Sequence, residues 1–245
     1  MFKKADLFLP VCDYFKRKLI LLGCKKSKIV VHHSAIDCSQ FFFTAKRKPQ
    51  KNTIHFVSAC RLVKKKGINY ALRAFAQIAK KYQKIHYTII GDGPEADYLK
   101  SLIEELNLQD KVTLCGWKSQ EEIVSILDKS HIFLSPSVRT DDGDEEGIAN
   151  ALKEAMAMGL IVVGSWHAGT SELIDHGISG FLTFEKDVSD LVQVIIYILE
   201  HPKEWKIIGE AARKKIEDEF EINVSIENLE KLFYRLLDEN MKEVK

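Results

Sequence analysis

Residues 53–93, TIHFVSACRLVKKKGINYALRAFAQIAKKYQKIHYTIIGDG, contain the repeating unit that decides the fold. The stretch opens with a short apolar run, Thr53–Ala59, continues through an amphipathic segment, Asn69–Tyr82, and closes with a second apolar run, Ile85–Ile90. Short apolar runs bounded by Gly, Asp, Ser or Pro are typical of buried parallel strands. Parallel strands need a crossover connection, which is usually a helix. The stretch therefore predicts a strand, a helix and a second strand.

The same alternation continues toward the C-terminus. Four further apolar runs are expected to be strands: Val112–Leu114, His131–Leu134, Leu160–Val163 and Phe181–Thr183. Two further amphipathic segments are expected to be helices: Pro94–Asn107 and Ser119–Lys129. Repeated alternation of this kind predicts an α/β fold with a doubly wound, Rossmann-like parallel sheet, in which ligands bind beyond the carboxyl ends of the strands. After Asp187 three helices are expected: Val188–Glu200, Pro202–Glu219 and Val224–Met241.

The first 50 residues differ from the rest. They contain one expected strand–helix–strand piece, which is too small to bury a core of its own: Asp6–Pro10, Val11–Leu22 and Lys28–His32. A linker follows this piece. The sequence thus predicts three parts: residues 1–50 as an N-terminal piece with its linker, residues 51–220 as the main domain, and residues 221–245 as a C-terminal helix.

Composition excludes several classes of protein. The sequence has no apolar run long enough for a membrane span and no signal-peptide pattern. Its five cysteines form no CxxC pair, which favours reduced thiols in the cytoplasm over disulfides or a zinc site. Net charge is +1, but residues 1–51 carry twelve Lys and Arg against three Asp. Such a segment suits an anionic membrane surface or an anionic acceptor, or is a solvated face. It has no nucleic-acid-binding pattern, so no nucleic-acid partner is expected.

A basic turn follows the strand that ends at Ala59. The turn contains Arg61 and Lys66, and Gly67 allows the backbone to bend tightly. Two cations beyond the carboxyl end of a strand suit the two phosphates of a pyrophosphate, because arginine grips oxygens bidentately and lysine adds a mobile charge. The alternative is a basic surface loop without a ligand.

Two glycine-containing turns follow the next two strands. Gly91, Asp92 and Gly93 form a strand-to-helix turn whose amides can approach a phosphate, although such turns also occur without a ligand. Gly116 allows a flat ring to come close to the backbone, and the ring of Trp117 either stacks on a base or covers the edge of the core.

The segment SPSVRTDDGDEEGIANALKEAMAMG, residues 135–159, carries two acidic side chains eight positions apart, Glu146 and Glu154. A helix that opens near Gly147 would separate them by about 12 Å, comparable to the length of a sugar diphosphate. The amides of Gly147 and Ile148 would then point at the anion, and Glu154 would accept hydrogen bonds from ribose hydroxyls. The alternative makes Glu146 a helix-dipole partner and Glu154 a surface residue. Farther on, His167 contacts the sugar or is a loop histidine.

Six motifs follow one another in order: RLVKKKG, IIGDGP, VTLCGW, LSPS, EGIANALKEAMAMGL and HAGTSELIDHGISGFL. In this order they resemble the donor-binding, C-terminal domain of retaining GT-B glycosyltransferases of family 4 (group 1). The paired glutamates are the best-known mark of that family. The run DGDEEGIANALKEAMAMG is similar to the branch that acts in colanic-acid and other exopolysaccharide assembly.

The resemblance implies a role for each matching residue. Arg61 and Lys66 bind the donor diphosphate, Glu154 takes the ribose, and Glu146 with the amides beside it takes the sugar and phosphate; Arg61, Lys66 and Glu146 are the implied catalytic residues. The other implied donor-binding residues are Gly91, Asp92, Gly93, Gly116, Trp117, Ser137, Gly147, Ile148 and Ala149. No metal or other cofactor is implied, because cations and amides of the protein neutralise the leaving diphosphate.

The sequence departs from the family pattern at several positions. Cys60 stands where the family usually has Gly, Lys64 where it often has Glu, and Ala149 where it often has Pro. The stretch His32–Asp37 resembles the interdomain connection, with Ala35 in place of a glycine. Of the N-terminal acceptor domain only the last strand–helix–strand is recognisable.

We therefore expect a cytoplasmic hexosyltransferase of which this chain supplies the donor-binding half. Its expected partners are a nucleotide sugar, a saccharide or lipid-linked acceptor, a separate acceptor-domain chain, and a peripheral contact with the inner face of the membrane. The alternative is a truncated, transfer-incompetent sugar-nucleotide-binding module or a subunit of a two-chain transferase. A sugar-nucleotide epimerase of similar fold is disfavoured by the glutamate spacing.

Overall fold

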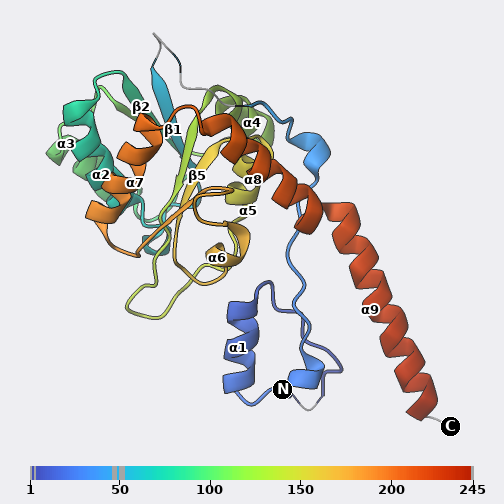
Figure 1. Cartoon of the computed structure of the whole chain (residues 1–245). Coiled ribbons are helices and arrows are strands. Elements are labelled where there is room, and N and C mark those ends of the chain that lie inside the picture. The colour runs from blue at the N-terminus through green and yellow to red at the C-terminus, as the bar shows by residue number, and fades with distance from the viewer. Residues whose placement is uncertain (1, 3, 46–48, 50–52, 244–245) are drawn as a thin grey trace.

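The computed structural model describes residues 2, 4–45, 49 and 53–243, with side chains described up to residue 238. Its centre is a sheet of six parallel strands in the order β3-β2-β1-β4-β5-β6 (Figure 1). The strands are β1 (Ile54–Ala59), β2 (Ile85–Ile90), β3 (Val112–Leu114), β4 (Ile132–Ser135), β5 (Ile161–Ser165) and β6 (Phe181–Thr183). This order is the one found in doubly wound dinucleotide-binding folds. The predicted α/β fold with a Rossmann-like parallel sheet is confirmed.

Helices cover both faces of the sheet. One core layer lies under α2 (Ile68–Lys81), α3 (Ala96–Glu105) and α7 (Val188–Glu200). The other lies under α4 (Gln120–Lys129), α5 (Asn150–Ala157) and α8 (Trp205–Glu219). Successive strand residues belong to opposite layers, as Phe56 and Val57 do, because side chains alternate across a sheet. The two layers explain why the strands are apolar throughout rather than alternating with polar residues.

The expected helix boundaries shift by a few residues. Helix α3 begins at Ala96, because Pro94 lies in the preceding turn, and α8 begins at Trp205 instead of Pro202. Helix α4 begins where expected: Ser119 and Glu122 form a capping box, in which the side chain of each residue accepts from the backbone amide of the other. Within the described residues, no helix combines the length and apolar character that crossing a membrane requires.

The loops that follow β1 and β4 meet at the centre of the sheet. Neighbouring strands β1 and β4 lead into crossovers on opposite sides, which makes this the point where ligands bind in such folds. The Val138 amide donates to the Lys65 carbonyl at 2.8 Å. Gly67 adopts φ +65°, and a Cβ atom there would lie 1.9 Å from the Pro136 carbonyl oxygen. The predicted tight turn at Gly67 is confirmed, and this close approach admits only glycine.

The N-terminal piece folds differently from the expectation. The residues predicted as two strands are joined by one isolated parallel bridge between Phe8 and Ile29, outside the six-stranded sheet. The prediction of regular strands there is wrong, because an isolated pair has no neighbouring strands to extend it. The predicted helix is present as α1 (Asp13–Leu21). Its first amides, at Asp13 and Tyr14, donate to the Glu172 carboxylate at 2.8 and 3.1 Å.

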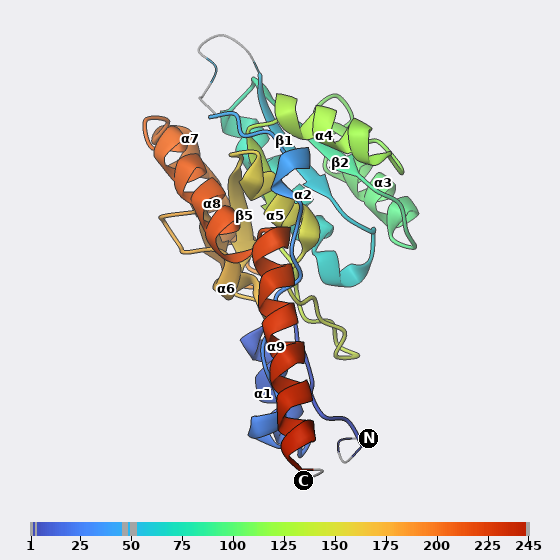
Figure 2. The same ribbon diagram turned by 90° about the vertical axis from the view of Figure 1, so that its right-hand side faces the viewer.

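The C-terminal helix leaves the body of the molecule. Helix α9 (Ile222–Glu243) runs from the main domain toward the end of the molecule where α1 lies (Figures 1 and 2). Near its start, Ser225 Oγ lies 3.2 Å from His32 Nε2 of the linker. The short helix α6 (Thr170–Leu173) lies between the sheet and the N-terminal piece, where Cys12 is fully buried against Gly169.

Candidate functional site

A pocket of about 380 Å³ opens at the carboxyl ends of β1 and β2, between these strand ends and helices α4 and α5. Five of the residues singled out from the sequence line it: Arg61, Gly91, Asp92, Trp117 and Glu154. They come from four separate segments of the chain, and tertiary folding brings them together. A pocket of this size is within the range of small-molecule sites, about 300–1,000 Å³.

Backbone contacts join the three loops that form the pocket floor. The Cys60 amide donates to the Ile90 carbonyl at 3.0 Å, and the Gly91 amide donates to the Gly116 carbonyl at 2.9 Å. Gly91 has φ +129°, and a Cβ atom there would lie 1.8 Å from the Cys60 carbonyl oxygen. A side chain at this position would therefore force the loops after β1 and β2 apart. The next glycine, Gly93, donates its amide to Asp92 Oδ1 at 2.7 Å.

The wall of the pocket contains an exposed indole. The Trp117 side chain is 76% exposed, so the interpretation that it covers the core edge is wrong. The ring instead lines the pocket, where it can stack on a flat ligand. On the floor, burial raises the pKa of the Cys60 thiol to about 11. The thiol is therefore neutral at physiological pH and serves as a small lining group.

Glu154 lies half-buried on α5, and burial raises the pKa of its carboxyl, an effect that the charge of Lys153 partly offsets. Lys153 itself is fully buried. Its ammonium contacts the Ser34 carbonyl and lies 2.8 Å from the Ser34 hydroxyl. Burial lowers the pKa of Lys153 to about 8. This lysine ties α5 to the linker that precedes the main domain, while its neighbour Glu154 lines the pocket.

The two loops beside the pocket carry an ion pair. Lys66 Nζ lies 2.5 Å from Glu146 Oε2, and both side chains are mostly buried. Helix α5 begins at Asn150 with Ala149 as an extended N-cap, so the prediction that the helix opens near Gly147 is wrong. The separation of about 12 Å inferred for an unbroken helix between the two glutamates therefore does not apply. The physical reason is packing before the helix: Ile148 is buried, and Gly147 lies against the Phe15 ring of α1.

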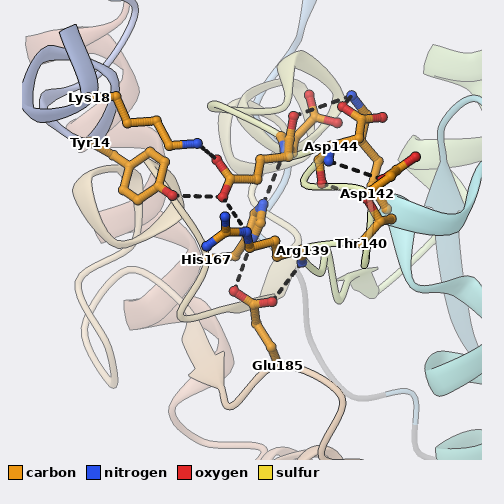
Figure 3. Close-up of polar contacts among 11 residues, drawn as sticks. Tyr14, Lys18, Arg139, Thr140, Asp142, Asp144, His167 and Glu185 are labelled. Atoms are coloured by element: carbon orange, nitrogen blue, oxygen red, sulfur yellow. Dashed lines mark hydrogen bonds and ion pairs between the residues drawn. The ribbon is translucent and has the colours of Figure 1, made fainter. Parts of the chain in front are cut away.

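His167 is a positioning residue that the sequence did not resolve. It lies in the loop between β5 and α6, as the second of the two interpretations has it, but it is only 2% exposed, so its ring is turned into the protein. Its Nε2 accepts from the Glu146 amide at 3.1 Å, and its Nδ1 lies 2.7 Å from Glu185 Oε1 (Figure 3). Because Nε2 accepts, the ring proton resides on Nδ1 and is donated to Glu185. The second Glu185 oxygen accepts from the Arg139 amide at 2.7 Å. One available signal for Glu185 was its place just after a predicted strand.

Glu145, like Glu185, is a residue that sequence reasoning missed. Its side chain is 3% exposed and contacts the Lys18 ammonium, Tyr14 Oη at 2.7 Å and Arg139 Nε at 3.0 Å. Figure 3 shows Tyr14 and Lys18 reaching toward this group from α1. Burial raises the pKa of the Glu145 carboxyl, but the hydrogen bonds from Lys18 and Tyr14 and the nearby charges outweigh it and lower the pKa overall. Glu145 therefore fastens α1 to the loop that carries Glu146.

We expect Glu145→Gln to loosen α1. The amide keeps the shape of the carboxylate but loses its charge, and a hydrogen bond to a charged group contributes about 1.5–3 kcal/mol. Solvent around the partly exposed Lys18 and Arg139 reduces this contribution. The amides of Asp13–Leu21 should therefore exchange roughly tenfold faster in the variant than in the wild type. Hydrogen exchange measured by mass spectrometry checks it. The matched control is Asp144→Asn, which removes an exposed carboxylate paired with Lys65.

The pH dependence of the same contact follows from the sign of the pKa shift. A carboxyl whose pKa is lower in the folded chain stabilises the fold above its unfolded pKa, about 4.3, and the stabilisation is lost as pH falls through the folded pKa. Docking of α1 should therefore be constant near neutral pH and weaken only below about pH 4.3. Equal exchange rates of α1 in the Glu145→Gln variant and the wild type would contradict this role.

Eight of the thirteen proposed donor-binding residues do not line the pocket: Lys66, Gly93, Gly116, Ser137, Glu146, Gly147, Ile148 and Ala149. Ser137 is 2% exposed, and its carbonyl accepts a hydrogen bond from the Ser165 hydroxyl. Ala149 is the N-cap residue of α5. Both residues belong to the loop between β4 and α5.

Comparison with protein families and known proteins shows the family of the chain. The family model for glycosyl transferases group 1 matches residues 39–215, more than half of the chain. The chain is 37% identical over 236 residues to the amylovoran biosynthesis glycosyltransferase AmsK of Erwinia amylovora. It is 35% identical over 237 residues to the putative colanic acid biosynthesis glycosyltransferase WcaL of Escherichia coli (strain K12). Each alignment covers 96% of this chain and 58% of the relative, so the chain spans little more than half the length of these relatives.

Solved structures share the fold. The crystal structure of Anabaena Alr3699/HepE in complex with UDP gives a TM-score of 0.84 at 20% identity, covering 96% of this chain and 65% of that one. Sucrose-phosphate synthase (tll1590) from Thermosynechococcus elongatus also gives a TM-score of 0.84 at 20% identity, and the match covers 97% of this chain and 60% of that one. The α/β, Rossmann-like fold is thus the one found in GT-B glycosyltransferase structures. On the strength of the family match, the chain belongs to the group 1 glycosyl transferases.

Proposed function

We propose that the chain is the donor-binding half of a glycosyltransferase. In this proposal the enzyme moves a hexose from a nucleoside-diphosphate sugar to a saccharide or lipid-linked acceptor, with retention of configuration. Relatives named for amylovoran and colanic acid biosynthesis support a role in surface polysaccharide assembly. The structural neighbour Alr3699/HepE, which was solved in complex with UDP, supports a nucleotide donor.

The observation that carries the proposal is the pocket at the ends of β1 and β2. It unites a cation, Arg61, an exposed ring, Trp117, and a half-buried carboxylate, Glu154. A nucleoside diphosphate presents the three matching groups: phosphates, a flat base and a ribose diol. Carboxylates accept hydrogen bonds from ribose hydroxyls in other folds with this strand order.

Each side chain then has a distinct task in the transfer. Negative charge develops on the leaving diphosphate, and Arg61 and Lys66 stabilise it. Because Lys66 is paired with Glu146, the phosphate must compete with this carboxylate or displace it toward the sugar. We propose that the two cations make a metal ion unnecessary, since they supply the neutralising charge themselves.

The acceptor must be positioned by other parts of the enzyme. We propose an acceptor domain in the same polypeptide or in a separate chain, which contacts the N-terminal piece. The exposed Leu21 and Leu22 at the end of α1 are suited to such an apolar contact or to a peripheral membrane contact. The alternative function is a transfer-incompetent module that binds the sugar nucleotide only. Acceptor-domain coding sequence directly upstream and in frame favours one enzyme, and a separate gene favours two chains.

Binding of nucleoside diphosphates tests the proposal directly. Isothermal titration of the 245-residue chain with UDP, GDP and ADP should give heat with at least one of them, with a dissociation constant between micromolar and millimolar. A thermal-shift screen with the corresponding sugar nucleotides then ranks the bases and sugars. Absence of heat with all three diphosphates would contradict the proposal.

A further inference from the structure

A second pocket, of about 410 Å³, lies beside the donor pocket. It is formed by the first turns of α2 and α3, the loop between β4 and α5, and Lys186 after β6. In both ribbon views the loop between β4 and α5 projects from the sheet as a long arm, and Arg139, Thr140 and Asp141 of this arm line the pocket (Figures 1 and 2). The residues of the proposed donor grip, Arg61, Lys66, Glu146 and Glu154, do not line it.

The two pockets lie along the same two segments of the chain: Arg61 and Asp92 line the donor pocket, and Lys64 and Glu95, three residues farther on in each segment, line the second pocket. Three consecutive lysines after β1 point to different places: Lys64 lines the second pocket, Lys65 Nζ lies 2.9 Å from Asp144 Oδ1, and Lys66 pairs with Glu146. A ligand in the second pocket is therefore separated from the proposed sugar-transfer position by one turn of backbone.

The lining offers several polar groups that the protein itself does not use. Lys64, Asn69, Tyr70 and Tyr98 make no side-chain hydrogen bond or ion pair with the described parts of the chain. Tyr98 is 45% exposed, and the Lys186–Asp141 pair at 3.6 Å is open to solvent. Unused donors and acceptors that converge on one pocket are available to a ligand.

The mixture of groups narrows the ligand class. Tyrosine rings offer an apolar face with a polar tip, which suits the alternating C–H and O–H surface of a pyranose. Carboxylates at Glu95 and Asp141 accept from hydroxyl groups, while Lys64 donates and Asn69 donates or accepts. The three cations of the lining, Lys64, Arg139 and Lys186, are largely offset by these two carboxylates, so the pocket has no strong excess of either charge and suits a ligand that is mostly uncharged.

We propose that this second pocket binds a sugar unit of a saccharide substrate, next to the unit that reacts. This assignment rests on the proposed glycosyltransferase function and adds to it a saccharide subsite within the donor-binding domain. The subsite holds a growing saccharide beside the turn that carries Lys64 and Lys66, so that its reacting end is directed toward Glu146 and Lys66.

Ligand-observed NMR on the whole chain tests the assignment. The probes are lactose, methyl glucoside and methyl glucuronide, measured by saturation transfer with and without UDP. We expect saturation transfer to at least one probe. The affinity for that probe should fall at least about fivefold in Tyr98→Ala and in Asn69→Ala. Tyr234→Ala, which removes a 69% exposed tyrosine on α9, is the matched control and should bind as the wild type does.

The outcomes separate the subsite from the donor site. Saccharide binding that survives Glu154→Ala but is lost in Tyr98→Ala supports the subsite. Binding that is lost in Glu154→Ala but unchanged in Tyr98→Ala places the sugar in the donor pocket and overturns it. If UDP binds but no saccharide probe receives saturation transfer, the subsite is also overturned, while the donor proposal stays intact. Saturation transfer to a saccharide probe, together with no binding of any nucleotide, would overturn the donor proposal alone.

Discussion

Replacing Glu154 with alanine is expected to weaken UDP or GDP binding roughly 10- to 150-fold, the range that corresponds to losing a charged hydrogen bond of about 1.5–3 kcal/mol. Glu154 lines the proposed nucleotide pocket, whereas Glu146 is turned toward Lys66 in the neighbouring loops. Glu146→Ala should therefore reduce nucleoside binding much less. Isothermal titration of each variant with the same nucleotide measures both effects.

The control for this comparison is Glu104→Ala, an exposed carboxylate on α3 whose loss should change nothing. Burial raises the pKa of Glu154, so its carboxylate is protonated at a higher pH than an exposed glutamate of pKa about 4.3. Nucleotide affinity should accordingly begin to fall on acidification before exposed glutamates titrate, and Glu154→Gln should remove that pH dependence. Equal and negligible effects of the two alanine substitutions would reject the ribose role.

The second large effect is expected from the double substitution of Arg61 and Lys66 by alanine. Each cation can make a charge-assisted bond to phosphate, and losing both should weaken diphosphate binding roughly 100-fold or more. The loss also leaves Glu146 without its partner beside the phosphate, which adds repulsion. Binding of the nucleoside without phosphates should be unchanged. Titration with UDP and with uridine, or with GDP and with guanosine, separates the contribution of the phosphates from that of the nucleoside.

Lys100→Ala with Lys129→Ala is the matched control, since it removes two exposed cations from α3 and α4. That variant should bind the diphosphate as the wild type does. If both double variants lost affinity equally, the effect would come from net charge and not from the turn after β1. If uridine binding fell together with UDP binding, the turn would act on the fold of the pocket instead of on the phosphates.

Much of the fold could be predicted from local pattern. The bounds of β2, β3, β6 and α7 match the expected residues because short apolar runs and a capped amphipathic helix are signalled by neighbouring residues alone. The N-terminal strands could not be predicted from the same kind of run. Phe8 and Ile29 pair with each other in an isolated bridge, and whether an apolar run becomes a regular strand depends on partners that lie elsewhere in the chain.

The site was predictable in its members but not in its contacts. Arg61, Gly91, Asp92, Trp117 and Glu154 were each marked by residue type and by position after a strand or on the following helix, and the structure brings them to one pocket. The start of α5 was misplaced because the burial of Ile148 and the contact of Gly147 with α1 decide where the helix can begin. Neither contact has a local signal.

Two adjacent residues, Glu145 and Glu146, show which features the sequence predicts and which only the tertiary structure decides. The sequence alone determined a doubly wound parallel sheet, the order of its motifs and the family to which they point, because periodicity and turn chemistry are local. Only the folded chain decided that Glu145 holds Tyr14 and Lys18 of α1 while Glu146 faces Lys66, and that His167 supports the Glu146 backbone and is itself held by Glu185. Adjacent side chains point in different directions, and their partners lie far away in the chain, so packing and not composition assigns their roles.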